Sequence, residues 1–226
     1  MTSDPPLIAL ISAVPAAIPP AVQALKDGFP DARIWNILDD RLIDEANERG
    51  SVDADLQRRM NRLIEHAVRE GADGILLTCS IYGFLAGRAA SSLEIPVLGP
   101  DDAAFAAVLD DGHQRIIVIS SVELALGDTV ERLRTAAAAR KLSPEIIPVF
   151  APGAYDASKR NDMGALTGAL KTAAAGRADE GDAILFAQYS LAPAAMAVQL
   201  HTKLPVYTGP ARSAAALRSA VGEARS

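Results

Sequence analysis

The chain has 226 residues, of which half are hydrophobic and 4% are aromatic, and its formal net charge is −6. This length allows one large domain or two small ones with a buried core. The acidic balance, without a Lys/Arg cluster, argues against nucleic acid and anionic membranes as partners. The single cysteine excludes an internal disulfide and a cysteine-based zinc site, and the three histidines lack the spacing of metal ligands.

The N-terminal sequence MTSDPPLIALISAV lacks a positively charged region. Its apolar run is too short for a signal peptide or a transmembrane helix. We therefore expect a cytoplasmic protein with no membrane partner. His66 and His113 are expected in solvent, and His201 near a helix C-terminus.

Short apolar runs alternate with alanine-rich helical stretches along the first half of the chain. The apolar runs predict strands at Leu7–Val14, Ala32–Leu38, Asp73–Thr78, Ile95–Gly99 and Arg115–Ser120. Helices are predicted from Pro19 to Gly28 and over Ser51–Gly71, where apolar residues recur at helical spacing. Continuous apolar strands that alternate with helices predict an α/β fold with a parallel sheet covered on both faces.

The second half of the chain repeats the first. GILLTC after Asp73 matches AILFAQ after Asp182, and the following Pro96–Val97 matches Pro205–Val206. Two earlier segments also pair, LIALISAV with RIIVISSV and ARIWNILDDRLID with PEIIPVFAPGAYD. Three matched segments in the same order indicate two α/β halves of similar topology.

Ligands in such sheets bind where the strands end. Four loops follow apolar strands at this position: Ser12–Pro15, Thr78–Tyr82, Ser120–Glu123 and Ala187–Leu191. Three of them are rich in small hydroxyl residues, and two lead toward helix N-termini. Backbone N–H groups and the helix dipole would make these loops a cradle for a carboxylate or a phosphate.

The repeat, the segment LLTCSIYG and the segment IPVLGPDDAA resemble the aspartate/glutamate/hydantoin racemase superfamily, which includes maleate isomerases and arylmalonate decarboxylases. The resemblance implies two pseudo-symmetric parallel-sheet domains with helices on both faces and an active site in the cleft between them. It also implies no cofactor and a small carboxylate substrate held between two thiols. The first half would then be 1–110 with the last helix, 211–226, and the second half 111–210.

Cys79 lies where this family carries its first cysteine. The second would fall six residues after Asp182, as Cys79 falls six after Asp73, and that position is Gln188. Gln188 has no titratable proton, so it cannot be the second acid, but it can hydrogen-bond a substrate carboxylate or amide. The sequence therefore departs from the two-thiol pattern.

Three roles of Cys79 stay open at this point. It can add as a nucleophile to an activated double bond or carbonyl, or it can protonate a carbanion left by decarboxylation. It can also be one base of a racemase whose second acid is unlike the family's, with Tyr189 and Tyr82 as candidates. The ordinary tyrosine pKa near 10 makes both poor acids at neutral pH.

The remaining candidates are expected to bind substrate. They are the backbone N–H groups of Ser80 and Ile81, the side chains of Ser12, Thr78, Ser80, Ser120, Ser121 and Ser190, and Gln188 and Tyr189. Each serine has an alternative role in satisfying turn backbone groups, and a lone buried cysteine has an alternative role as a small hydrophobe.

The sequence thus predicts a cofactor-independent racemase or isomerase that acts on a small carboxylate-bearing substrate through Cys79. The alternatives are a decarboxylase of malonate-type acids and a non-catalytic small-acid-binding protein. The identity of the substrate and the number of subunits, a homo-oligomer among the options, stay open.

Overall fold

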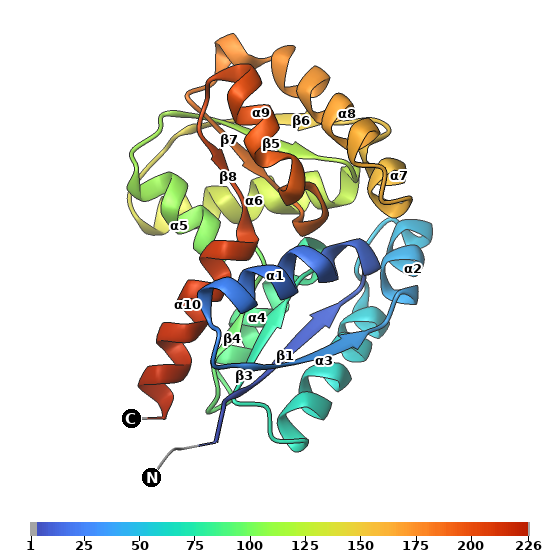
Figure 1. Cartoon of the computed structure of the whole chain (residues 1–226), viewed down its shortest axis with the longest axis vertical. Coiled ribbons are helices and arrows are strands. Elements are labelled where there is room, and N and C mark those ends of the chain that lie inside the picture. The colour runs from blue at the N-terminus through green and yellow to red at the C-terminus, as the bar shows by residue number, and fades with distance from the viewer. Residues whose placement is uncertain (1–3, 226) are drawn as a thin grey trace. The chain divides into compact units, whose positions relative to one another are not determined.

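The computed structural model describes residues 4–225, which form two compact units (Figure 1). The first unit runs to Pro100 and resumes at Pro210, and the second is Asp101–Gly209. Each unit has one four-stranded parallel sheet. The predicted fold class, two parallel-sheet α/β units, is confirmed.

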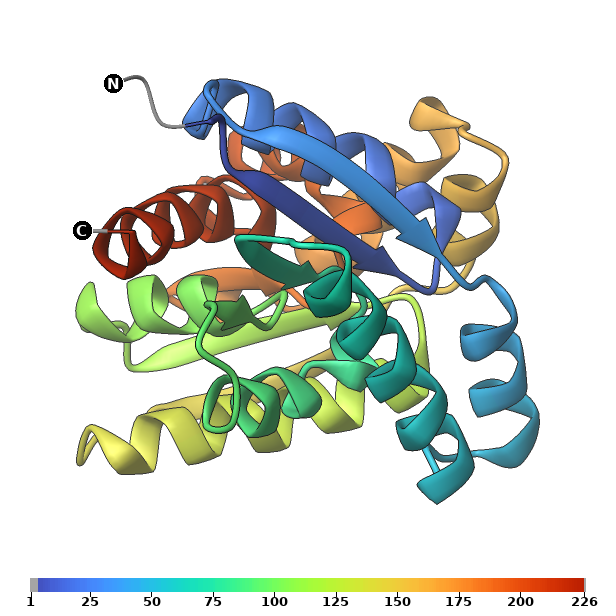
Figure 2. The same ribbon diagram turned by 90° about the horizontal axis from the view of Figure 1, so that it is seen from below.

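The first unit has the strand order β2-β1-β3-β4. Its strands are β1 (Leu7–Ser12), β2 (Arg33–Leu38), β3 (Gly74–Leu77) and β4 (Val97–Leu98). Its helices and 3-10 turns are η1 (Pro15–Ala17), α1 (Ile18–Gly28), α2 (Arg41–Arg49), α3 (Ala54–Arg69), η2 (Ser80–Tyr82), α4 (Phe84–Ala90) and α10 (Gly209–Ala224). Figure 2 shows β1 and β2 running side by side in the same direction.

The second unit has the same topology, with the order β6-β5-β7-β8. Its strands are β5 (Arg115–Ser120), β6 (Glu145–Phe150), β7 (Ala183–Phe186) and β8 (Val206–Tyr207). Its helices and 3-10 turns are α5 (Asp102–Asp110), α6 (Glu123–Ala139), α7 (Ala154–Lys159), α8 (Met163–Ala175), η3 (Ala178–Glu180), η4 (Tyr189–Ala194) and α9 (Ala195–Thr202).

The internal repeat predicted from sequence extends to single hydrogen bonds. In the first unit, a carboxylate oxygen of Asp73 accepts a bond of 2.7 Å from the N–H of Leu7, the first residue of β1. In the second unit, Asp182 accepts a bond of 3.0 Å from the N–H of Arg115, the first residue of β5. The two aspartates that begin the matched segments therefore have the same role. Each accepts a hydrogen bond from the first residue of the neighbouring strand.

Both sheets are covered by helices because their strand residues are apolar on both faces. In the second unit, Ile117 and Phe186 pack with α7, α8 and α9, whereas Val118 and Leu185 pack with α5 and α6 on the other face. Among the described residues, no helix is both long and apolar enough to cross a membrane.

The structure differs from the sequence-based expectations at three places. The predicted division between the halves was at 110/111, whereas the units divide at Pro100/Asp101, because Phe105 and Val108 of α5 pack into the core of the second unit. Helix α2 was not predicted, since its nine residues carry only a short buried stripe. His113 was expected in solvent, but it is half-buried and its Nε2 lies 2.9 Å from the hydroxyl of Tyr207.

The last helix packs on the first unit, where it leaves no room for a side chain on Gly74. A Cβ atom there would lie 2.8 Å from Cγ2 of Val221 on α10. We expect Gly74→Ala to lower the free energy of unfolding by about 1–3 kcal/mol through overpacking. The control is Gly87→Ala on α4, where a Cβ meets nothing within 4 Å. Chemical denaturation that finds the two variants equally stable would contradict this packing.

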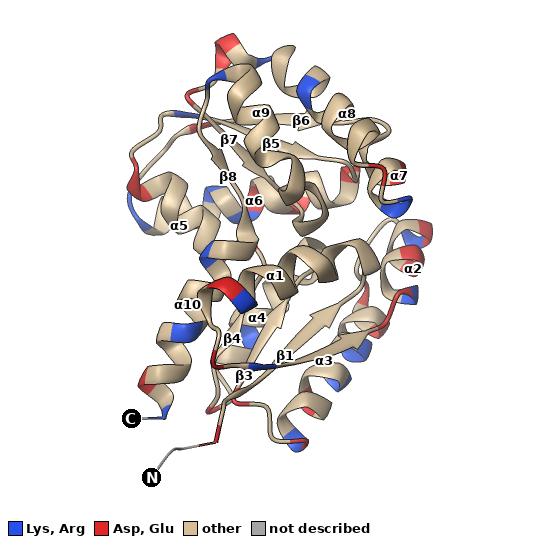
Figure 3. Ribbon diagram, in the orientation of Figure 1, with Lys and Arg blue, Asp and Glu red and all other residues tan. Residues whose placement is uncertain are grey.

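Charged residues of both signs are intermixed on α2 and α3 (Figure 3). Glu45 accepts from Arg41 at 2.8 Å, from Arg49 at 2.7 Å and from Arg59 at 2.8 Å, so one carboxylate pairs with three guanidinium groups. Desolvation would raise the pKa of Glu45, but the hydrogen bond from Arg59 and the positive charges of the three arginines outweigh it, so the pKa is lowered. Opposite charges on these two helices are therefore paired with one another.

Candidate functional site

The strand ends of the first unit bring together two predicted site residues, Ser12 and Thr78. Ser12 is the last residue of β1, and Thr78 directly follows β3, the neighbour of β1 in the sheet. The hydroxyl of Thr78 donates to the hydroxyl of Ser12 at 2.8 Å, and both side chains are buried. Two of the four predicted strand-end loops are therefore joined by a polar contact at the carboxyl edge of this sheet.

Cys79 is the next residue, and it lies between the end of a strand and a turn, as predicted. The apolar strand β3 ends at Leu77, and Cys79 caps the 3-10 turn η2, which contains Ser80 and Ile81. Only 7% of the residue is exposed. The next helix, α4, begins at Phe84, because residues 80–82 form the 3-10 turn.

Tyr82 is the last residue of this turn, and its side chain lies in the interior of the first unit. Its hydroxyl donates to the carbonyl oxygen of Leu42 at 3.0 Å, and the side chain is fully buried. Burial raises the pKa of Tyr82 above its ordinary value, and the nearby Cys79 and Asp39 act in the same direction. A phenol in this state is a poorer acid than an ordinary tyrosine, so Tyr82 is a structural residue.

We expect Tyr82→Phe to leave the thiol unaffected. The change removes the bond to the buried carbonyl of Leu42, which costs about 1–2 kcal/mol of unfolding free energy. Urea unfolding measures this loss, and the rate at which iodoacetamide labels Cys79 should stay within about twofold of the parent protein, since the phenol takes no part in proton transfer. A large drop in labelling rate at unchanged stability would show instead that the hydroxyl acts on the sulfur.

An ion pair beside Tyr82 was missed by the sequence interpretation. Asp39 directly follows β2, and its carboxylate binds the guanidinium of Arg59 through two contacts of 2.5 and 2.7 Å. Arg59 also binds Glu45 at 2.8 Å, and its pKa is raised, because these carboxylates outweigh its desolvation. Asp39 lies in the loop after β2 and Arg59 on α3, twenty residues further along the chain, so no spacing rule connects them.

In the second unit, Gln188 has the place that Cys79 has in the first. The N–H of Thr78 donates to Ile11, and the N–H of the matching Ala187 donates to Ile119. The next residue then caps a 3-10 turn, η2 after Cys79 and η4 after Gln188. The predicted alignment of the cysteine with the glutamine therefore holds in the backbone.

Gln188 also brings together two further predicted residues, Ser120 and Ser121. Its side-chain oxygen Oε1 accepts from the N–H of Ser121 at 2.7 Å, from the hydroxyl of Ser121 at 2.9 Å and from the hydroxyl of Ser120 at 3.1 Å. Ser120 ends β5, the neighbour of β7. The carboxyl edge of the second sheet thus carries a polar cluster at the position that corresponds, in the repeat, to the Ser12–Thr78 contact of the first.

Tyr189 and Ser190 follow in η4, and both are buried. Their role as substrate contacts stays a prediction. That the two polar clusters bind one substrate together also stays a prediction. Within residues 4–225, no three His, Cys, Asp or Glu side chains are grouped as a metal site requires.

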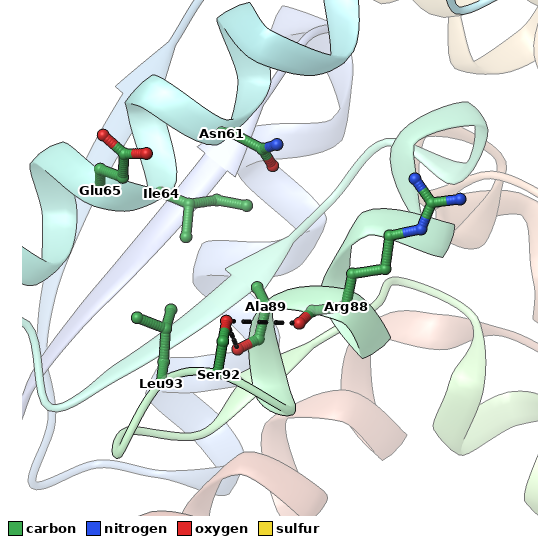
Figure 4. Close-up of a pocket in the computed structure, with 7 residues that line it drawn as sticks. All are labelled: Asn61, Ile64, Glu65, Arg88, Ala89, Ser92 and Leu93. Carbon is green, nitrogen blue, oxygen red and sulfur yellow. Dashed lines mark hydrogen bonds between the residues drawn. The ribbon is translucent and has the colours of Figure 1, made fainter. Parts of the chain in front are cut away.

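A surface groove between α3 and α4 is distinct from the strand ends (Figure 4). It is lined by Asn61, Ile64, Glu65, Arg88, Ala89, Ser92 and Leu93. The hydroxyl of Ser92, in the turn after α4, donates to backbone carbonyls of that helix, and the guanidinium of Arg88 points away from Ile64 and Leu93. The polar groups do not converge on one point, so the groove is not a candidate active site.

The chain has the two-unit α/β fold of amino-acid and allantoin racemases. It superposes on the aspartate racemase of Picrophilus torridus with a TM-score of 0.75 at 16% identity, over 97% of this chain and 98% of that one. A glutamate racemase of Bacillus anthracis gives 0.77 at 13% identity, over 98% and 83%. An allantoin racemase of Klebsiella pneumoniae gives 0.70 at 16% identity, over 96% and 88%.

No family model matches the chain, and no curated protein sequence matches it at a significant level. The similarity to the solved structures confirms the resemblance to the aspartate/glutamate/hydantoin racemase superfamily for the fold alone. The reaction and the residues that carry it are proposals.

Proposed function

We propose that the chain is a cofactor-independent isomerase that acts on a small carboxylate-bearing substrate through the thiol of Cys79. The observation that carries the proposal is the position of this thiol. It is the only sulfhydryl of the chain, and it lies just after the end of a buried parallel strand. The preceding residue, Thr78, donates its hydroxyl to that of Ser12. Ligands of parallel α/β sheets bind at this edge.

One thiol is sufficient for an isomerisation that goes through covalent addition. The thiolate adds to an activated carbon–carbon double bond, so that a carbon–sulfur bond forms and the π electrons move onto the conjugated carboxylate as an enolate. The remaining single bond rotates, the enolate re-forms the double bond, and the thiolate leaves. No proton is gained or lost overall, and no second acid is needed.

Gln188 favours this type of reaction over a two-thiol racemisation. Racemisation by two bases needs a second group that gives and takes a proton near neutral pH. The amide of Gln188 has no such proton. Decarboxylation of a malonate-type acid, followed by protonation from Cys79, also needs only one proton-exchanging group. It is the second candidate.

The other strand-end residues are proposed to hold the substrate. Ser12, Thr78 and the N–H groups of Ser80 and Ile81 would receive the negative charge of the enolate in the first unit. Hydrogen-bond donors aimed at a developing oxyanion are worth about two to three orders of magnitude in rate. In the second unit, the proposed contacts are Ser120, Ser121, Gln188, Tyr189 and Ser190.

The experiment is incubation in deuterated water with small chiral acids, hydantoins, substituted malonates and unsaturated dicarboxylates, followed by NMR. Interconversion of geometric or optical isomers supports the proposal. Release of carbon dioxide supports the decarboxylase instead. Binding of these acids without any turnover would contradict both and identify a small-acid-binding protein.

A further inference from the structure

The side-chain amide of Gln188 has a fixed orientation. A backbone N–H can only donate, so the atom 2.7 Å from the nitrogen of Ser121 must be the amide oxygen and not the amide nitrogen. The hydroxyl of Ser121 reinforces the same assignment at 2.9 Å. The two bonds come from one residue and hold the oxygen within the second unit.

Ser120 adds a third contact and is itself held in place. Its hydroxyl oxygen accepts from the N–H of Val122 at 3.1 Å and lies 2.9 Å from the carbonyl oxygen of the same residue. The single hydrogen of this hydroxyl is shared between that carbonyl and Gln188, so the two donors of Ser121 are the ones that determine the amide orientation.

The amide nitrogen of Gln188 is directed away from this anchor. The oxygen and the nitrogen of a planar amide point in different directions from the same carbon, and within residues 4–225 no acceptor is bonded to Nε2. The residue is half-buried, and Nε2 is not among the buried, unpaired polar atoms of the described residues, so this nitrogen is accessible to solvent. Gln188 therefore presents two N–H donors and no acceptor to whatever binds there.

We propose that Gln188 is a substrate-positioning residue whose Nε2 donates to a carboxylate or carbonyl oxygen of the substrate. The inference rests on the proposed function and adds to it a chemical requirement. The substrate must carry an acceptor oxygen for the second unit, and Gln188 orients that group without exchanging a proton with it. The serine anchor preorganises the donor, which is what a positioning group requires.

The test uses Gln188→Glu, which keeps the shape and the acceptor oxygen for Ser121 but replaces the NH2 donor with a second, negatively charged oxygen. The control is Gln199→Glu, which makes the same charge change on α9, where the side-chain oxygen accepts only from the N–H of Val206 at 3.2 Å. Malonate is the probe, and calorimetry measures its binding. All variants are made in Cys79→Ser, so that the result does not depend on chemistry at the thiol.

We expect Gln188→Glu to weaken malonate binding by about 10–100-fold, the range for a lost hydrogen bond to a charged group, and Gln199→Glu to leave it unchanged. Gln188→Ala, which adds no charge, should weaken binding about tenfold and covers the case in which the glutamate variant does not fold. Equal binding by the parent and both Gln188 variants, or no binding by the parent, would overturn the inference. Failure of the proposed function shows up separately, as full turnover in Cys79→Ser alone.

Discussion

Replacing Cys79 by serine is expected to lower turnover by about 10²–10⁴-fold or more, because it removes the group that exchanges a proton or attacks the substrate. A hydroxyl is a much weaker acid and nucleophile than a thiol of almost the same size. The measurement is steady-state kinetics on the compound that the substrate panel identifies. Cys79→Ala should be at least as impaired.

The control for this loss is Ser91→Ala, which removes an exposed hydroxyl at the end of the neighbouring helix α4. It should retain the parent rate. Circular dichroism and urea unfolding establish that Cys79→Ser is folded. If the serine variant turns over substrate at the parent rate, the thiol mechanism is wrong and both the isomerase and the decarboxylase proposals fall with it.

The second large effect is on stability, and it concerns Arg132 of α6. Its guanidinium binds Asp101 at 2.5 Å and Asp128 at 2.7 Å, and it stacks over the ring of Phe105. The side chain of Asp101 is only 3% exposed and that of Arg132 15%. Desolvation works against the charge of Arg132, but the two carboxylates more than offset it and raise its pKa.

We expect Arg132→Ala to lower the free energy of unfolding by about 3–5 kcal/mol, because it leaves the Asp101 carboxylate buried without its cation. Arg134→Ala on the same helix is the matched control. Arg134 is 55% exposed and pairs with the exposed Glu131, so its loss should cost no more than about 1 kcal/mol. Urea unfolding compares the two. Similar losses in both variants would show that the buried pair does not make the predicted contribution to the free energy of unfolding.

The sequence was sufficient to predict the elements whose signal is local. The runs LIALIS and RIIVIS form β1 and β5, and the stripe of apolar residues in 51–71 forms α3. The repeat also predicted that Cys79 and Gln188 occupy matching positions, since both are defined by their distance from an aspartate that ties two strands together.

The contacts at the strand ends could not be predicted from the sequence. Thr78 and Ser12 are 66 residues apart, and Gln188 and Ser121 are 67 residues apart, so only the sheet brings them together. The same holds for Asp39 with Arg59, whose partners belong to different elements. α2 was missed for a different reason, because nine residues provide too few turns for a clear helical period.

The central claim, that turnover depends on the thiol of Cys79, is tested most directly by titration with iodoacetamide. The chain has one cysteine, so intact mass spectrometry gives the alkylated fraction without ambiguity. The account predicts that activity falls in proportion to that fraction and reaches zero when every chain carries one carbamidomethyl group. Cys79→Ser, the reagent control, should gain no mass. Undiminished activity in fully alkylated protein would contradict the account.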